Sequence, residues 1–227
     1  MRNLLLFGFL LVFSVARSQQ TFVYTDPNAA YRKGVELFEE KNYASARRQF
    51  EKIYEQRLDN TASKNTLLFT EVEYMIAVSA AENNDVDAEP LLFNFLQNHS
   101  DSHRSAYINF YLGRYYYMNN KYQECIDQLA KLSADEIPDK YRTDYKFQLG
   151  YCYFVKKKFD EAKPLFKAIK DIKEKYYYPS NYYYAFICFY KKEYNEALKS
   201  FLAIEDSKMF SSVIPYYVSQ IYYMKKD

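Results

Sequence analysis

Few residues in this sequence could carry out chemistry, and their spacing does not indicate a site. The two histidines, His99 and His103, are four residues apart, a spacing that on a helix could hold a metal ion. The residues between them, Ser100, Asp101 and Ser102, are typical of a loop, and a metal site needs three or four fixed ligands. We therefore interpret this segment as a solvent-exposed turn and predict no metal site.

The remaining reactive residue types are equally dispersed. Cys125, Cys152 and Cys188 are odd in number and far apart, which argues against a disulfide framework and favours small buried packing residues. The four glycines are too few for a phosphate-binding loop, and the sequence has no G-x-x-x-x-G-K pattern. Catalysis needs a convergent set of titratable groups. The sequence therefore predicts a protein that is not an enzyme and needs no cofactor.

Residues 1–18 have the pattern of a secretory signal peptide. A short basic start with Arg2 precedes an apolar run over 4–15, and Ala16 and Ser18 form a small-x-small cleavage site. The apolar run is shorter than the roughly 20 residues that span a bilayer. We therefore expect an exported protein, with an extended lead-in over 19–27 and no transmembrane segment.

The charge balance disfavours nucleic acid as a partner. The full chain has a formal net charge of +2, and removing Arg2 and Arg17 with the signal leaves equal numbers of basic and acidic residues. A neutral, mixed surface provides no long-range attraction to a polyanion. Protein or peptide partners are the remaining expectation.

An internal repeat organises the chain after the signal. Small residues set among aromatic ones recur at intervals of 34 to 43 residues by subtraction of their numbers, and this interval is typical of helical repeats. The six small residues are Gly34, Ala77, Gly113, Gly150, Ala185 and Ser219. Scarce glycine and proline favour long helices joined by short turns.

Each repeat also carries a second set of residues at fixed distances. Four units have another small residue twelve positions later and a large apolar one four positions after that. These pairs are Ala46 and Phe50, Cys125 and Leu129, Ala162 and Phe166, and Ala197 and Phe201. The second unit is degenerate: its counterparts are Val86, Glu89, Phe93 and Leu96, with the small residue displaced to Ala88. This spacing predicts helical hairpins in which small residues allow close backbone approach and large ones fill the space between hairpins.

These motifs resemble a known family. The segments Leu112-Gly113-x-x-Tyr116 and Leu149-Gly150-x-x-Tyr153, the latter followed by Phe159-Asp160-Glu161-Ala162-x-x-x-Phe166, are similar to the tetratricopeptide-repeat (TPR) consensus. With its signal, the chain resembles long exported TPR proteins of Gram-negative envelopes, which implies a location in the periplasm or cell envelope of a Gram-negative bacterium. The resemblance implies an all-α, right-handed superhelix of about five hairpins and a partial sixth. The expected units are 28–61, 62–104, 105–140, 141–176, 177–211 and 212–227.

The expected helices follow from the same register. We predict them near 28–41, 44–57, 64–83, 87–98, 104–119, 122–132, 140–157, 159–171, 180–192, 194–204 and 209–225. The last unit lacks its second helix, which would leave an aromatic face uncapped. We therefore expect either that the chain is part of a longer protein or that a partner, including a second copy, covers this end.

The family resemblance also implies which residues line the concave face. The partner-binding residues expected there are Tyr107, Phe110, Arg114, Tyr117, Phe147, Tyr151, Phe154, Tyr182, Phe186, Phe189 and Tyr190. Such an aromatic surface suits an apolar or aromatic segment of a partner. The alternative is that the rings pack between helices and leave no open groove. Arg114 alone is basic at its repeat position, so the carboxylate clamp of some TPR domains is not expected.

The function that these features favour is an exported scaffold that binds proteins. One alternative is an N-terminal docking or sensory module of a larger exported signalling protein or enzyme. A second is a glycan-binding module, which the absence of tryptophan disfavours.

Overall fold

The computed structural model describes residues 27–59, 66–100 and 102–226, and within these ranges the secondary structure is entirely helical. The expected signal peptide and residues 19–26 of the lead-in lie outside the described residues. The helices are α1 (Pro27–Glu39), α2 (Tyr43–Asp59), α3 (Thr66–Glu82), α4 (Ala88–Asn98), α5 (Ser105–Met118), α6 (Tyr122–Leu129), the 3₁₀ turn η1 (Ala134–Glu136), α7 (Asp139–Val155), α8 (Phe159–Lys167), α9 (Tyr177–Tyr190), α10 (Tyr194–Leu202) and α11 (Ile214–Met224).

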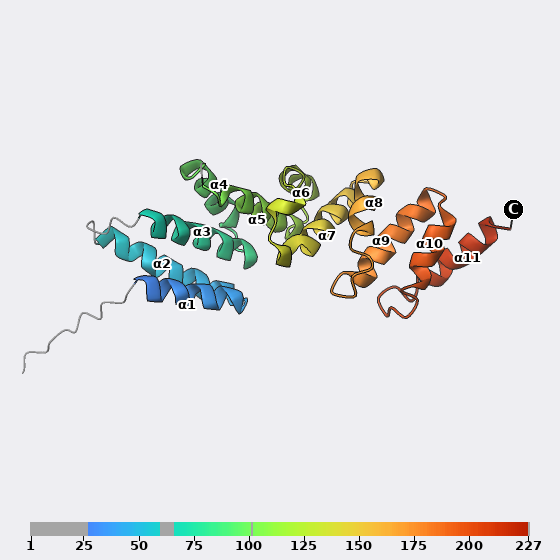
Figure 1. The fold of residues 1–227 in the computed structure, drawn as a ribbon, viewed down its shortest axis with the longest axis horizontal. Coiled ribbons are helices and arrows are strands. Elements are labelled where there is room, and N and C mark those ends of the chain that lie inside the picture. The colour runs from blue at the N-terminus through green and yellow to red at the C-terminus, as the bar shows by residue number, and fades with distance from the viewer. Residues whose placement is uncertain (1–26, 60–65, 101, 227) are drawn as a thin grey trace, which may run out of the picture.

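The helices form a series of hairpins along the long axis of the molecule, with α1 near one end and α11 at the other (Figure 1). Each hairpin packs on the next, and the first helices α3, α5, α7 and α9 also contact one another in succession. The buried apolar residues form two clusters that meet at α7. The predicted all-α solenoid is confirmed.

A left-handed residue closes the turn in each complete hairpin. It falls seven positions after the small residue of the unit, and φ lies between 57° and 63°. The five residues are Lys41, Asn84, Asn120, Lys157 and Lys192. The following amide donates back to the last turn of the first helix, as from Lys158 N to Tyr153 O at 2.9 Å. Such a bond satisfies helix-end carbonyls that would otherwise have no donor.

In the first and third units, the small residue of the first helix packs against the large apolar residue of the second helix. A Cβ placed on Gly34 would lie 2.6 Å from Phe50, and one on Gly113 would lie 2.3 Å from Leu129. Phe50 and Leu129 are themselves fully buried. The two helices of these hairpins therefore approach so closely that the second occupies the space of the missing side chain.

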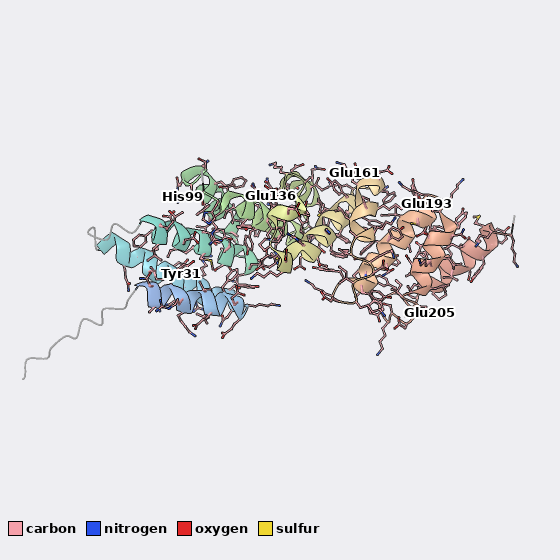
Figure 2. All side chains as sticks on the ribbon, viewed as in Figure 1. Tyr31, His99, Glu136, Glu161, Glu193 and Glu205 are labelled. Atoms are coloured by element: carbon pink, nitrogen blue, oxygen red, sulfur yellow. The ribbon has the colours of Figure 1, made fainter. Side chains whose placement is uncertain are left out.

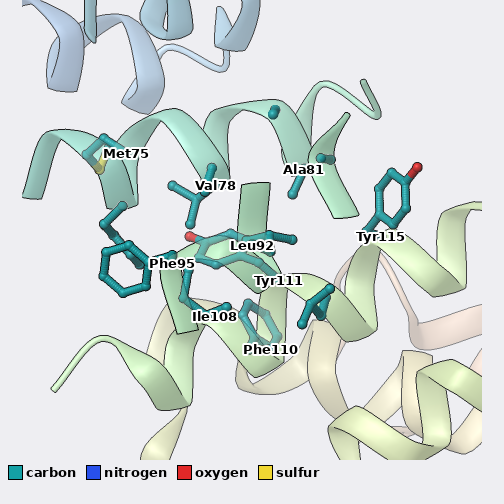
Figure 3. Close-up of a cluster of buried hydrophobic side chains, with 14 of the residues drawn as sticks. Met75, Val78, Ala81, Leu92, Phe95, Ile108, Phe110, Tyr111 and Tyr115 are labelled. Carbon is teal, nitrogen blue, oxygen red and sulfur yellow. The ribbon is translucent and has the colours of Figure 1, made fainter. Parts of the chain in front are cut away.

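The second hairpin differs from the predicted register. Val86 is 94% exposed and Phe93 is 40% exposed, so neither is a core residue. Leu92 and Phe95, each one position earlier than predicted, are buried between α3 and α5 (Figure 3). Helix α4 begins at Ala88, eleven residues after Ala77, whereas the second helices of the other complete hairpins begin nine residues after their small residue.

Arg47 of α2 holds the turn before α4. Its Nη1 donates to Asp85 Oδ2 at 2.7 Å, and its Nη2 donates to Asp87 Oδ2 at 2.6 Å. The two carboxylates lie on the segment that departs from the common register. The irregular turn is therefore tied directly to the preceding hairpin.

Several predicted helix bounds also need correction. Helix α9 begins at Tyr177, because Pro179 lies in its first turn, where a missing amide costs no hydrogen bond. Helix α11 begins at Ile214 rather than near residue 209, and the preceding residues form turns. Helices α6 and α8 end at Leu129 and Lys167, a few residues earlier than expected.

The three cysteines are free and buried, which confirms their interpretation as packing residues. Among the described residues, no helix is long and apolar enough to cross a bilayer.

Candidate functional site

The predicted partner-binding residues lie on α5, α7 and α9, which are first helices of their hairpins. We call the side of the solenoid that the first helices form the first-helix face. It is built by α1, α3, α5, α7, α9 and α11. On this face Tyr190 is 65% exposed, whereas Phe110 and Phe147 are buried. The other predicted residues are half-buried. Phe147 is therefore a core residue, and the expectation that it touches a partner directly is wrong for this chain. Phe110 is also buried, and its ring forms part of the wall of the cavity described below.

Most of the half-buried rings contact each other. Tyr117 lies edge-on to Tyr151 at 5.8 Å between ring centroids, and Phe154 contacts Phe186 in the same manner at 5.3 Å. Phe189 continues the series by packing on Tyr217 at 5.2 Å. The alternative of interhelical packing therefore describes much of this aromatic set. Only parts of the rings are open to solvent.

Two residues that the sequence interpretation missed are central to this packing. Tyr183 contacts Tyr151 at 5.3 Å and Phe154 at 4.8 Å, and Tyr217 stacks on Phe201 at 5.2 Å. Both lie two positions before the small residue of their unit, as Tyr111 does in the third unit. The repeat register could have identified this column of tyrosines.

Burial keeps Tyr111, Tyr117 and Tyr183 neutral at physiological pH. Burial raises the pKa of Tyr117 to about 12, with a further contribution from Tyr151. Burial also raises the pKa of Tyr183 and of Tyr111. The face therefore offers ring surface and hydroxyl groups rather than phenolate charge.

Arg114 is held by an ionic network that crosses three repeats. Its Nε donates to Glu82 Oε1 at 2.8 Å, and its Nη1 lies 3.7 Å from Asp144 Oδ2. Asp144 also accepts hydrogen bonds from Tyr176 Oη and from Lys175 Nζ. Burial by itself would raise the pKa of Asp144, but these donors outweigh it and the pKa is lowered. Arg114 therefore links α3, α5 and α7, and its charge is already compensated within the chain.

A cavity of about 250 Å³ opens on the first-helix face between the first four hairpins. Its lining is mainly aromatic and apolar, from α1, α3, α5 and the start of α7. The lining rings are Tyr31, Phe38, Tyr74, Tyr107, Phe110, Tyr111 and Tyr141. Figure 2 marks Tyr31 on α1. The volume falls below the 300–1,000 Å³ typical of small-molecule sites, so the cavity suits a single large side chain.

Charged residues frame this cavity. Arg104 lies 4.7 Å from the centroid of the Tyr74 ring and is paired with Glu71, whose Oε2 accepts from Nη2 at 2.6 Å. Lys140 Nζ lies 3.2 Å from Glu39 Oε1, so an ion pair joins the fourth hairpin to the first. The cavity thus has an apolar interior and a rim of balanced charge.

The histidine segment is less solvated than predicted. His99 Nε2 lies 2.5 Å from Glu73 Oε2, and its side chain is 23% exposed, whereas that of His103 is 69% exposed. His99 follows the last residue of α4, as the loop prediction required. Within the described ranges, no cluster of three or more His, Cys, Asp or Glu residues could hold a metal ion.

Known structures resemble this chain in fold at low sequence identity. MamA of AMB-1 matches with a TM-score of 0.58 and 21% identity over 85% of this chain and 97% of that one. MamA of MSR-1 matches with a TM-score of 0.57 and 20% identity over 82% and 98%. PilF of Pseudomonas aeruginosa matches with a TM-score of 0.52 and 17% identity over 86% and 88%. No protein-family model and no curated protein matches the sequence.

Proposed function

Since the chain has the fold of a tetratricopeptide-repeat solenoid, we propose that it is a non-enzymatic scaffold that binds proteins through its first-helix face. The observation that carries the proposal is the aromatic cavity of about 250 Å³. A partner inserts one large apolar or aromatic side chain there. Rings with hydroxyl groups suit this role, because they contribute large contact area and retain hydrogen-bonding ends.

The half-buried rings of α5, α7 and α9 extend this contact along the solenoid. Tyr190 presents the most exposed ring among the predicted residues. The expected partner segment is therefore apolar at its anchor and makes further ring contacts towards the C-terminal hairpins. The signal-like pattern of residues 1–18 favours export to the cell envelope. If the signal is cleaved as expected, N-terminal sequencing of the mature protein should give Gln19 as its first residue.

A glycan is a weaker candidate ligand for the same face. Sugar recognition would use open ring faces, but the faces here are partly covered by other rings. Phe147 stacks on Tyr176 at 4.2 Å, and Tyr182 stacks on Phe210 at the same distance. A docking module of a larger exported protein would use the same cavity, so that alternative concerns the context of binding rather than the surface.

The test fills the cavity without removing surface polarity. Val35 is half-buried and lines the cavity, so Val35→Phe places a ring in the cavity where the partner side chain would bind. Capture of envelope proteins by cross-linking should fall about tenfold or more, as expected when a buried anchor contact is lost. The control is Tyr178→Ser, which changes a partly exposed tyrosine of α9 that neither lines the cavity nor belongs to the predicted partner-binding residues.

Circular dichroism establishes that both variants remain helical. If Val35→Phe captures the same proteins as the wild type, the cavity is not the anchor site. Loss of capture in both variants would indicate a nonspecific effect of surface change and would also contradict the proposal.

A further inference from the structure

Helix α11 is the last helix that the structure describes, and it lies at the opposite end of the molecule from α1 (Figure 1). Its inner side packs on α10, where Ile214 and Ile221 are buried, and Tyr217 reaches the Phe186 ring of α9. Its outer side is exposed. The residues of this outer side are Pro215, Tyr216, Ser219, Tyr222 and Tyr223, and we call them the α11 face.

Ser219 is the small residue of its unit, but its surroundings differ from those of its counterparts. In each of the five preceding units the small residue is buried. The second helix of the same hairpin packs on it, as Leu129 does on Gly113. Ser219 is exposed. The α11 face is therefore centred on the position that receives a second helix in the complete hairpins, and a helix is the element that fits it.

The α11 face carries no charge. No charged residue lies between Lys208 and Lys225. Helix α1, at the other end of the solenoid, instead exposes Arg32, Lys33 and Glu36, as expected for a terminal helix that faces water. Packing α11 on α1 of another copy would bury these three charges, which is costly. Head-to-tail association is therefore disfavoured.

The centre of the face can lose its water without leaving a hydrogen-bond donor unpaired. Ser219 Oγ donates to Pro215 O at 2.7 Å, within the same helix, and Pro215 has no amide hydrogen. Around this centre Tyr216, Tyr222 and Tyr223 are 61%, 51% and 65% exposed. Their rings offer apolar area, and their hydroxyl groups can remain in water at the margin of a contact. Burial of this face therefore avoids the main cost of burying polar groups.

The sequence of the face is self-complementary about Ser219. Tyr216 lies three residues before Ser219 and Tyr222 lies three after it, while Pro215 and Tyr223 lie four before and four after. In an antiparallel pair of α11 helices centred on Ser219, Tyr216 of each copy lies opposite Tyr222 of the other, and Pro215 lies opposite Tyr223. A twofold interface requires this reciprocity, in which one residue contacts a second and the second contacts the first. The small Ser219 side chain at the centre allows the two helices to approach closely.

The lysines after α11 do not oppose this arrangement. Lys225 and Lys226 lie six and seven residues after Ser219, so Val213 and Ser212 lie opposite them in the antiparallel pair. Residues 209–213 carry no charge. The pairing therefore brings no two like charges together along the helix.

We propose that the α11 face binds α11 of a second copy of this chain and forms a symmetric, antiparallel helix pair. The inference goes beyond the proposed function and does not rest on it, because the five residues of the face do not line the aromatic cavity. An aromatic side chain buries roughly 150–250 Å², so the three tyrosines contribute on the order of 250–450 Å² per copy. This is less than the roughly 800 Å² per partner of a standard interface, so the dimer is weak and depends on concentration.

The test measures the association of the full-length mature chain by sedimentation equilibrium over a range of concentrations. Ser219→Glu places two like charges opposite each other at the centre of the pair and should raise the dissociation constant about tenfold or more. Ala29→Glu, which adds the same charge at an exposed position of α1, should leave the dissociation constant unchanged. Circular dichroism establishes that each variant remains helical.

A second pair of variants tests the symmetry. Ser219→Lys alone should weaken association as Ser219→Glu does, because it also places like charges opposite each other. An equimolar mixture of the two variants should associate again, with a dissociation constant within about threefold of that of the wild type, because opposite charges then meet at the centre. The mixture is measured at low ionic strength, where exposed charges are least screened.

Three results would overturn the inference. A wild type that stays monomeric at its highest soluble concentration would leave the face to a different protein or to further helices of a longer chain. Unchanged association of Ser219→Glu would place the contact elsewhere on the molecule. Failure of the mixture to associate would show that the two Ser219 positions do not face each other. Capture through the cavity is tested separately with Val35→Phe, so failure of the dimer is distinguishable from failure of the scaffold function.

Discussion

At the scale of single residues, the helix glycines differ in how closely they are approached. A Cβ on Gly113 would lie 2.3 Å from Leu129 Cδ2 and 2.4 Å from its Cγ, and Leu129 is fully buried. A Cβ on Gly150 would lie 3.2 Å from Phe166 Cε1, a tight contact that a small shift of the ring relieves. The same repeat position therefore tolerates a methyl group to different degrees.

Gly113→Ala should lower the free energy of unfolding by about 1–2 kcal/mol, because overpacking exceeds the gain in helix propensity of roughly 1 kcal/mol. Gly150→Ala should change it little or raise it slightly. Urea unfolding followed by circular dichroism measures both variants. Equal changes in the free energy of unfolding at the two positions would show that the close approach of Leu129 to Gly113 does not destabilise the alanine variant.

At the scale of helices, α8 contains a residue that its conformation disfavours. Pro164 lies inside α8, is exposed, and can donate no amide to the carbonyl one turn earlier. Pro179 of α9 lies in the first turn, where this amide has no helical partner in any case. Pro164 therefore removes a hydrogen bond from its helix, whereas Pro179 does not, although both residues lie in helices.

Pro164→Ala should raise the free energy of unfolding by about 1–3 kcal/mol, because it restores one hydrogen bond and removes a steric conflict. Pro179→Ala, the matched control, should leave it nearly unchanged. Thermal or urea unfolding of the two variants makes the comparison. A larger gain at Pro179 than at Pro164 would contradict this account of α8.

At the scale of the whole molecule, most contacts between hairpins join neighbours, although the Glu39–Lys140 ion pair joins the first hairpin to the fourth. The buried residues divide into two clusters at α7. Phe201 is fully buried in the C-terminal cluster and stacks on Tyr217 with an interplanar angle of 2°. A solenoid built in this way can lose structure at one end and retain it at the other.

Phe201→Ala should destabilise the C-terminal hairpins by about 3–5 kcal/mol. Hydrogen exchange should then accelerate in α9, α10 and α11, while α1 to α4 keep their protection. Phe93→Ala, which removes a partly exposed ring from α4, should have little effect. Uniform loss of protection along the chain in Phe201→Ala would show that the solenoid unfolds as one cooperative unit.

The sequence by itself determined the repeat architecture. The distance of sixteen residues from Gly34 to Phe50, and from Gly113 to Leu129, is set by one helix, one turn and part of the next helix. Both partners of such a contact lie within one hairpin, so their spacing can be read locally. The same reasoning identified the helical hairpins.

Only the tertiary structure decided which rings are open and where a partner side chain fits. Phe110 and Phe147 share repeat positions with more exposed residues, yet both are buried. The cavity depends on α1, α3, α5 and α7 together, and the ion pair at its rim joins Glu39 to Lys140, 101 residues apart. Small rotations between successive hairpins add up over such distances. The spacing of residues within one hairpin does not determine the total rotation. The solenoid was therefore predictable from the sequence, whereas the shape of its binding surface was not.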